Sequence, residues 1–273
     1  MIGVRLDGRL GNQLFQYALA ISLAKKFKTF YIIDNDYKAD YVKKYFKTKP
    51  FLNNKLGRQL FKKWLAPGLP FMHQIGHETP DMTLPLLYDN QFYKGFFQSE
   101  RYFQNVSSSI HKSLQVKKKY AKEFSTKYGH LFSKQKLLVI HYRLGDYLTW
   151  GTAEWGGTDM SLPETYYRNA LKQIKQVEDY TVVIVTDDAK NMEGKLENIP
   201  GKLIISDTEI MDFQLMLHAD KLIISNSSFA WWGAYLNKNK AEVFVPQYWL
   251  GFKVDKEIPA DIIPARFISV PVR

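Results

Sequence analysis

The segment from Lys221 to Asn237 constrains the fold of this chain more than any other part of the sequence. Its first residues, Lys221 to Ser225, form a short apolar run that is typical of a buried strand. From Asn226 onward, small hydroxyl residues and then aromatic residues open a helix. A further strand over Val243 to Val245 completes a β-α-β unit. The segment therefore predicts a parallel sheet with helices on its faces.

Strands and helices alternate in both halves of the chain. In the first we expect a strand over Ile2 to Arg5, a helix over Asn12 to Phe27 and a strand over Phe30 to Ile33. Farther on, the pattern predicts strands over residues 137–141, 181–185 and 203–205, a helix from Pro163 to about Gln176, and a helix around residues 210–217. We therefore predict an α/β protein with two Rossmann-like domains, residues 1–134 and 135–273.

The stretch between these patterns is less regular. Residues 40–85 mix short helical pieces, prolines and aromatic residues, and we interpret them as a helical insertion in the first domain that carries a variable surface. Residues 92–98 indicate a further strand, and the lysine-rich residues 107–132 indicate a helical region.

The chain is basic. Its 273 residues include 38 Lys and Arg against 27 Asp and Glu, a net charge of +11. This excess points to an acidic partner, which can be a nucleotide-phosphate substrate, nucleic acid or an anionic membrane surface. The lysines concentrate over residues 38–63 and 112–136, away from the motifs below, so solvated helix faces explain them better than a nucleic-acid site. A basic face resting on anionic lipid is a further option.

Cysteine and long apolar segments are both absent from the sequence. Without cysteine the chain has neither disulfides nor thiolate metal ligands, which suits a reducing compartment. No run approaches the roughly 18 apolar residues of a membrane-spanning helix, and no signal sequence is evident. We therefore expect a cytoplasmic protein, with peripheral binding to the inner membrane face as an option that its charge leaves open.

The junction at Asn226 is a candidate anion site. The first N–H groups of a helix and the positive end of its dipole point at one place, where Ser227 and Ser228 add hydroxyl donors. A phosphate group is the kind of ligand that such a junction binds. Trp231 and Trp232 follow in the helix and are expected to be core residues.

A second candidate follows the strand over residues 137–141. Arg143 offers a permanently charged, forked donor suited to a diphosphate, and ligands of open α/β sheets bind beyond the carboxyl ends of strands. Asp146 is close enough in sequence to orient the guanidinium, with Gly145 allowing a tight turn. An internal Arg–Asp bridge beside a satisfied His141 is the alternative interpretation.

Two more strand ends carry polar residues. Residues 7–13 form a glycine-bearing loop that can approach a ligand closely, with Asn12 either as a ligand-binding amide or as the helix N-cap. Asp187, after the strand over residues 181–185, can accept a hydrogen bond from a ribose or a base edge. Equally, Asp187 can be a carboxylate that stabilises the N-terminus of the following helix through the helix dipole.

Metal and hydrolase chemistry have weaker support. Asp34 and Asp36 form an Asp-x-Asp pattern able to hold a divalent ion on a diphosphate, although an Asx-rich turn explains it better. The six histidines show no metal-ligand spacing, and there is no Gly-x-Ser-x-Gly elbow. A metal-dependent transferase using Asp34 and Asp36 stays as one alternative, and a nucleic-acid-binding protein as another of a different class.

Three of these motifs occur in an order that resembles a known family. Residues 8–18 (GRLGNQLFQYA), 141–147 (HYRLGDY) and 226–233 (NSSFAWWG) are similar to the motifs of the bacterial α-1,2-fucosyltransferases, glycosyltransferase family 11. The resemblance extends over most of the chain. Leu144 stands where the family usually has a second arginine, while Arg143 matches the first.

The resemblance implies a GT-B fold, in which two Rossmann-like domains face each other across a cleft. It also implies inverting transfer of L-fucose from GDP-L-fucose to the 2-hydroxyl of a terminal galactoside in an oligosaccharide or surface glycan, with no metal and no cofactor. The implied catalytic residues are Arg143, Asn12 and His141, with Asp146 in support. The implied donor-binding residues are Gly11, Asp187, Asn226, Ser227, Ser228 and Phe229.

The acceptor and the general base are less defined. Residues 40–85 and the loop over residues 150–160 are expected to shape the acceptor pocket. Trp150 and Trp155 are candidate platforms for an acceptor sugar, or else packing residues. Asp7, Asp146 and His141 are each chemically able to act as the base, and the sequence does not choose among them.

Overall fold

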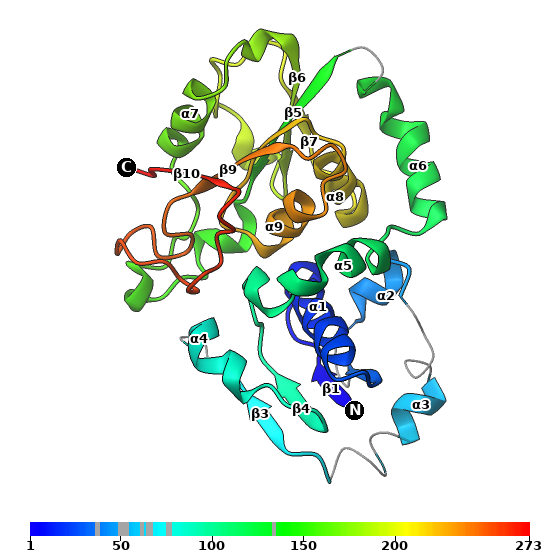
Figure 1. Cartoon of the computed structure of the whole chain (residues 1–273). Helices are drawn as coiled ribbons and strands as arrows, with labels where there is room; N and C mark the ends of the chain where they lie inside the picture. Colours follow the sequence, from blue (N-terminus) through cyan, green and yellow to red (C-terminus); the bar gives the residue numbers. More distant parts are fainter. Residues whose placement is uncertain (36–38, 49–54, 61–62, 64–67, 75–77, 133–134) are drawn as a thin grey trace. The chain divides into compact units, whose positions relative to one another are not determined.

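The computed structural model divides the chain into two compact units, each with its own parallel sheet (Figure 1). It describes residues 1–35, 39–48, 55–60, 63, 68–74, 78–132 and 135–273. The first unit comprises Met1–Lys117 together with Pro259–Ile262, and the second comprises Lys118–Ile258 together with Ile263–Arg273. Within the described residues, no helix is long and apolar enough to cross a bilayer.

The first unit is built on a four-stranded parallel sheet with the strand order β2-β1-β4-β3. Its strands are β1 (Ile2–Arg5), β2 (Tyr31–Asp34), β3 (Phe71–His73) and β4 (Gln91–Lys94). Its helices are α1 (Leu10–Lys26), α2 (Tyr41–Tyr45), α3 (Lys55–Leu60), α4 (Pro80–Thr83) and α5 (Ser107–Ser113), with 3-10 turns at Leu84–Leu86, Glu100–Tyr102 and Gln104–Val106. Because α1 contacts both β1 and β2, the β-α-β start predicted for the chain is confirmed.

Residues 40–85 are more than an insertion, because they contain a strand of the sheet. β3 pairs in parallel with β4, so that Phe71 lies opposite Phe92. The rings of these two residues stack with their centroids 5.6 Å apart. So short an edge strand, with Phe71 half exposed, gives no clear alternation in the sequence. Residues 49–54, 61–62, 64–67 and 75–77 of the predicted insertion lie outside the described residues.

Three predicted boundaries in the first part of the chain were wrong. Helix α1 begins at Leu10 rather than at Asn12. β4 ends at Lys94, before the predicted Gln98, because the chain turns at Gly95 with a φ of +146° that favours glycine. The lysine-rich helical region is broken between Ser113 and Lys118, where Val116 forms an antiparallel bridge with Phe46.

A buried glutamine of α1 joins the loops that leave β1 and β4. The Gln16 side chain is fully buried. Its Oε1 accepts the N–H of Asp7 at 3.0 Å, and its Nε2 donates to the carbonyl of Gly95 at 2.9 Å. A buried amide that satisfies two backbone groups holds both loops at the carboxyl edge of the sheet.

A second buried glutamine joins the loops after β1 and β2. Gln13 is also fully buried. Its Nε2 donates to the carbonyls of Ala39 at 2.8 Å and Gly8 at 3.3 Å, while its Oε1 accepts the N–H of Tyr41 at 2.9 Å. The two glutamines explain why the start of α1 carries amides on its inward face.

The second unit is built on a six-stranded parallel sheet with the strand order β10-β9-β8-β5-β6-β7. Its strands are β5 (Lys136–Tyr142), β6 (Tyr180–Thr186), β7 (Leu203–Ile205), β8 (Lys221–Ile223), β9 (Glu242–Pro246) and β10 (Ile268–Val270). Its helices are α6 (Lys118–Tyr128), α7 (Glu164–Lys172), α8 (Glu209–Leu217) and α9 (Ser228–Tyr235), with 3-10 turns at Gly129–Leu131, Gly145–Leu148, Ala153–Trp155, Val177–Asp179 and Lys190–Met192. The strands predicted in this half are confirmed with small shifts at their ends, whereas β10 has no counterpart among them.

Helix α7 differs from its prediction at both ends. Pro163 is the N-cap residue rather than the first residue of the helix. The helix ends at Lys172 rather than near Gln176, whose backbone is left-handed with a φ of +54°. A residue in that conformation cannot continue a right-handed helix.

Helix α6 belongs to the second unit, because it packs on α8. The Gln214 Nε2 atom of α8 donates to the carbonyl of Tyr120 in α6 at 3.2 Å. Lys127 and Tyr128, at the end of α6, bond to the Asp207 carboxylate at 2.7 and 2.6 Å. The boundary between the compact units therefore follows Lys117, whereas the sequence places the domain boundary between residues 134 and 135.

We expect Gln16→Leu to destabilise the protein by about 2–6 kcal/mol, because it leaves two backbone groups without their partner at roughly 1–3 kcal/mol each. Denaturant unfolding measures this change. Gln115→Leu is the matched control, since the side chain of Gln115 is exposed and its loss is expected to cost less than about 0.5 kcal/mol. Equal effects of the two variants would contradict the role given to Gln16.

We expect Asp212→Asn to stabilise the protein above neutral pH and to have little effect in acid. Asp212 is buried in α8 and accepts the Asp207 N–H at 3.2 Å, and burial raises its pKa to about 7. Because the folded state holds this proton more tightly than the unfolded state, wild-type stability falls as the pH rises from about 4 to about 7. Asparagine removes that loss, so the unfolding free energy should rise by up to about 4 kcal/mol at pH 8. A gain that is independent of pH would contradict this account.

Candidate active site

The candidate site lies at the carboxyl edge of the second sheet. β5 pairs in parallel with β6 on one side and with β8 on the other. The three strands end at Tyr142, Thr186 and Ile223, directly before Arg143, Asp187 and the Ile224–Asn226 loop. Because carboxyl ends of neighbouring parallel strands meet at one edge, the sheet brings together three of the polar segments singled out in the sequence.

Arg143 is held between two carboxylates. Its Nη1 lies 3.1 Å from Asp187 Oδ2, and its Nη2 donates to Asp146 Oδ1. Its guanidinium also lies over the ring of Tyr147, 5.2 Å from the centroid. The side chain is only 13% exposed, and its Nε has no hydrogen-bond partner among the described residues. An oriented cation with one unused buried donor is suited to an incoming anion.

Asp187 also shapes the turn after β5. Its Oδ1 accepts the N–H of Leu144 at 2.9 Å. At Gly145, where φ is +28°, a Cβ atom would lie 2.2 Å from Asp187 Oδ2, so only glycine fits. Leu144 itself is buried. The family's usual second arginine is thus replaced here by a core residue.

His141 is a buried neutral imidazole. It is 3% exposed, its Nδ1 lies 2.8 Å from Ser225 Oγ, and its ring lies 5.9 Å from that of Phe229. Burial, and next the positive charge of Arg143, lower its pKa to about 3. His141 therefore stays uncharged throughout the neutral range and packs beneath the site.

The N-terminus of α9 lies at the same sheet edge as Arg143, because α9 follows β8, the strand that pairs with β5. Ser227 is its N-cap residue, and the Ser227 side chain makes no capping hydrogen bond. Within the helix, Trp231 and Trp232 are fully buried, which confirms them as core residues. At Gly233 a Cβ atom would approach Met216 of α8 to 2.8 Å, so glycine permits the close packing of α8 and α9. This packing fixes the direction in which the helix N–H groups point.

Tyr147 connects Arg143 to the start of α9. Its hydroxyl donates to the carbonyl of Asn226 at 3.1 Å, and burial raises its pKa to about 12, so it remains a donor at neutral pH. The Asn226 Nδ2 atom donates to the carbonyl of Met160 at 3.0 Å, and the Met160 N–H donates to the backbone carbonyl of Tyr147 at 2.7 Å. Asn226 Oδ1 is buried without a partner among the described residues. These bonds attach the 147–160 loop to the junction at Asn226.

An aromatic row extends from Tyr147 along this loop. Trp150 stacks on Tyr147 with centroids 5.5 Å apart, and Trp155 lies 4.9 Å from Trp150. Trp150 is 46% exposed, whereas Trp155 is partly buried. Trp150 thus presents an open indole face, and Trp155 supports it by packing.

In the first unit, Asn12 is not a helix cap. Arg9 is the N-cap residue of α1, and Asn12 lies within the first turn, where its Oδ1 accepts the Gln98 Nε2 at 2.8 Å. Gly8 has a φ of +72°, and a Cβ there would lie 2.3 Å from Asn12 Nδ2. Gly11 is buried inside α1. The glycine loop is therefore shaped around the Asn12 amide.

Asp34 of the Asp-x-Asp pattern is an ion-pair partner. It is 2% exposed, and its Oδ2 lies 3.0 Å from Arg5 Nε. Asp36 lies outside the described residues. Across the residues that the structure does describe, no group of three or more His, Asp or Glu side chains could hold a metal ion.

Two contributors to these sites, Tyr147 and Gln16, do not stand out in the sequence. Tyr147 lies inside the 141–147 motif, but an aromatic residue there gives no sign that it bridges Arg143 and Asn226. Gln16 lies on the buried face of α1, where a polar residue in an otherwise apolar row is the one available signal.

Solved fucosyltransferase structures share this fold. NodZ alpha-1,6-fucosyltransferase from Bradyrhizobium, soaked with GDP-fucose, matches with a TM-score of 0.56 at 14% identity, over 86% of this chain and 92% of that chain. A mutant of Arabidopsis thaliana FUT1 in complex with GDP matches with a TM-score of 0.54 at 10% identity, over 89% of this chain and 69% of that chain. These likenesses confirm the predicted GT-B-like α/β fold.

Two proteins of Escherichia coli are similar in sequence. The O-antigen biosynthesis glycosyltransferase WbnK is 25% identical over an alignment 295 residues long, and this alignment covers 89% of this chain and 93% of WbnK. An alpha-1,2-colitosyltransferase is 28% identical over 191 residues, which cover 64% of this chain and 61% of that protein.

The family model for glycosyl transferase family 11 matches residues 1–257. This match includes the loop at Gly8, the Arg143 turn and the junction at Asn226, and it confirms the resemblance seen in these motifs. The chain belongs to glycosyl transferase family 11.

Proposed function

We propose that this glycosyltransferase moves L-fucose from GDP-L-fucose to the 2-hydroxyl of a terminal galactoside, with inversion and without a metal ion. Family membership supports transfer from a sugar donor. A solved fucosyltransferase of the same fold was soaked with GDP-fucose, which supports the choice of donor. The observation that carries the proposal is Arg143, a clamped cation with an unused buried Nε donor beside the α9 N-terminus.

The chemistry follows from where charge develops. As the bond between the sugar and the diphosphate breaks, negative charge grows on the phosphate oxygens of the leaving GDP. Arg143 is permanently charged and already oriented, so it stabilises this charge without reorganising. The Ser227 and Ser228 hydroxyls and the helix N–H groups add donors at the same sheet edge. Because these contacts strengthen as charge develops, they lower the barrier more than they strengthen ground-state binding.

The remaining donor contacts are assigned by type of side chain. We place Phe229 beside the nucleoside, because its ring is partly exposed and rests on His141 and Phe213. Asp187 pairs with Arg143, and we propose that it also accepts a hydrogen bond from the nucleoside. Gly11 and Asn12 keep the donor-binding and catalytic roles that the family motif implies.

His141 is proposed as a positioning residue rather than as the base. An imidazole whose pKa is about 3 is too weak to take a proton effectively at neutral pH. It supports Ser225 and Phe229 from below instead. The general base is left unassigned between Asp7 and Asp146.

Trp150 is the proposed acceptor platform on the second unit. Its exposed ring can pack against the apolar face of a sugar, and Tyr147 and Trp155 keep it oriented. Trp155 contributes by supporting that ring.

A different donor sugar is the second candidate. The similarity to an alpha-1,2-colitosyltransferase favours colitose as the alternative to fucose. A metal-dependent transfer through Asp34 is less favoured, because that carboxylate is buried in an ion pair with Arg5. Peripheral membrane binding through the exposed Lys118, Lys119 and Lys122 of α6 stays a prediction.

We expect Arg143→Ala to lower the rate of fucosyl transfer to lactose by about 10²–10³, because one preorganised electrostatic donor is lost. Product formation from GDP-fucose, measured with EDTA present and followed by linkage analysis, tests donor, linkage and metal independence together. Arg168→Ala is the control, since Arg168 lies on α7 and pairs with Glu164. Wild-type transfer by Arg143→Ala would refute the assignment, and loss of wild-type activity in EDTA would refute metal independence.

We expect Asp187→Asn to reduce transfer more than Asp146→Asn. Asp187 is 27% exposed and also holds the Leu144 N–H, whereas Asp146 is 54% exposed and is screened by solvent. The expected losses are at least about 10-fold for the first variant and about 3-fold or less for the second. Steady-state rates at saturating donor measure both, and a reversed order would show that Asp187 does not position Arg143.

A further inference from the structure

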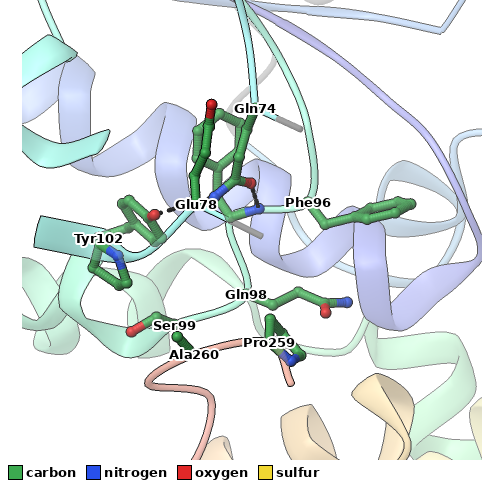
Figure 2. A pocket seen from close by; sticks show the side chains of 10 residues that line it. Gln74, Glu78, Phe96, Gln98, Ser99, Tyr102, Pro259 and Ala260 are labelled. Atoms are coloured by element: carbon green, nitrogen blue, oxygen red, sulfur yellow. Dashed lines mark hydrogen bonds between the residues drawn. The ribbon is translucent and has the colours of Figure 1, made fainter. Parts of the chain in front are cut away.

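The first unit contains a pocket beyond the carboxyl ends of β3 and β4 (Figure 2). Its volume is about 50 Å³, enough for a few water-sized groups such as the hydroxyls along one edge of a sugar ring. Its walls come from Gln74 after β3, from residues 96–99 after β4 and from Pro259 and Ala260. Ligands of open α/β sheets bind at this edge, so the pocket lies where a ligand is expected.

One buried acceptor in this pocket has no partner among the described residues. The Glu78 Oε2 atom is buried and makes no hydrogen bond to any described residue. A buried carboxylate oxygen without a donor costs free energy, and such atoms in native proteins call for an explanation. Glu78 lines the pocket, so a ligand that brings a hydroxyl donor would satisfy it.

The polar side chains of Gln74 and Tyr102, which also line the pocket, have hydrogen-bond partners within the protein. Gln74 Oε1 accepts the Phe97 N–H at 2.7 Å, and its Nε2 donates to the Tyr102 hydroxyl at 3.2 Å. The Tyr102 hydroxyl also bonds to Thr83 Oγ1 at 2.5 Å. These bonds hold the side chains of Gln74 and Tyr102 in place, whereas the Glu78 oxygen can accept a hydrogen bond from a ligand.

The other lining residues favour an uncharged ligand. Among the residues that the structure describes, the ten that line the pocket include no lysine, arginine or histidine, and the Glu78 carboxylate would repel a phosphate. Phe96 is 40% exposed, and it extends to the same side of the loop as Gln98 in Figure 2. One aromatic face, an amide and a carboxylate together can hold both the apolar face and the hydroxyls of a sugar.

The pocket is connected to the family motif and closed by a clamped segment. Gln98 Nε2 donates to Asn12 Oδ1 at 2.8 Å, so one wall is attached to the first turn of α1. On the other side, Arg101 bonds to Asp261 at 2.9 Å and also to Asp81. Arg101 thereby holds the Pro259–Ile262 segment against the first unit.

We propose that this pocket is a subsite for a sugar residue of the glycan acceptor. Glu78 accepts a hydrogen bond from a sugar hydroxyl, and Phe96 packs on the apolar face of the ring. The assignment of this sugar to the acceptor rests on the proposed function, whereas the binding of a neutral sugar rests on the pocket alone.

The test measures sugar binding and transfer separately in the full chain. Lactose binding is followed by NMR titration, and the KM for lactose is followed in the transfer assay. Glu78→Gln keeps the size of the side chain but removes its charge, and Phe96→Ala removes the exposed ring. We expect each variant to weaken lactose binding and to raise the KM for lactose by at least about 10-fold. The rate of GDP-fucose hydrolysis should change by less than about 2-fold, because the donor site is unaltered.

Glu123→Gln and Phe71→Ala are the matched controls, since both side chains are exposed and neither lines the pocket. Unchanged lactose binding and KM in both Glu78→Gln and Phe96→Ala, with the fold intact by thermal unfolding, would overturn the subsite. If wild-type protein transfers no fucose, the proposed function fails, yet the NMR titration still decides whether Glu78 and Phe96 bind a sugar.

Discussion

The contact between Arg143 and Asp187 is the interaction on which the candidate site depends. It joins the ends of β5 and β6, and the same carboxylate holds the Leu144 N–H and leaves room only for glycine at position 145. A mostly buried cation is costly unless it is paired, and two carboxylates meet that cost here. The consequence is an arginine whose direction is set before any ligand arrives, which is what electrostatic catalysis requires.

Buried amides play the corresponding part in the first unit. Gln13 and Gln16 satisfy backbone groups of the loops that leave β1, β2 and β4. These bonds place the Asn12 turn and the loop after Gly95 at one sheet edge, where Gln98 joins them through Asn12. The family motif at residues 8–18 therefore organises the loops at the carboxyl edge of the first sheet.

Local patterns predicted much of the fold, because β5 and β6 are continuous apolar runs and α7 has a clear apolar face in the sequence. They missed β3 and β10, which are short strands at the sheet edges, and they gave no sign that α6 packs on α8, because that is a long-range contact. For the site, the tendency of ligands to bind beyond the carboxyl ends of parallel strands predicted that Arg143, Asp187 and the Asn226 junction would lie at one sheet edge. It gave no sign of the Glu78 oxygen that lacks a partner among the described residues, or of the bridge through Tyr147, because burial and long-range contacts arise only in the folded chain.

A crystal structure of the complex with GDP tests the central claim most directly. We expect the diphosphate to lie at the N-terminus of α9 and Arg143 Nε to donate to a phosphate oxygen at about 2.7–2.9 Å. We also expect Asp187 still to hold the guanidinium in the complex. A diphosphate bound elsewhere, with Arg143 Nε still lacking an acceptor, would contradict the account.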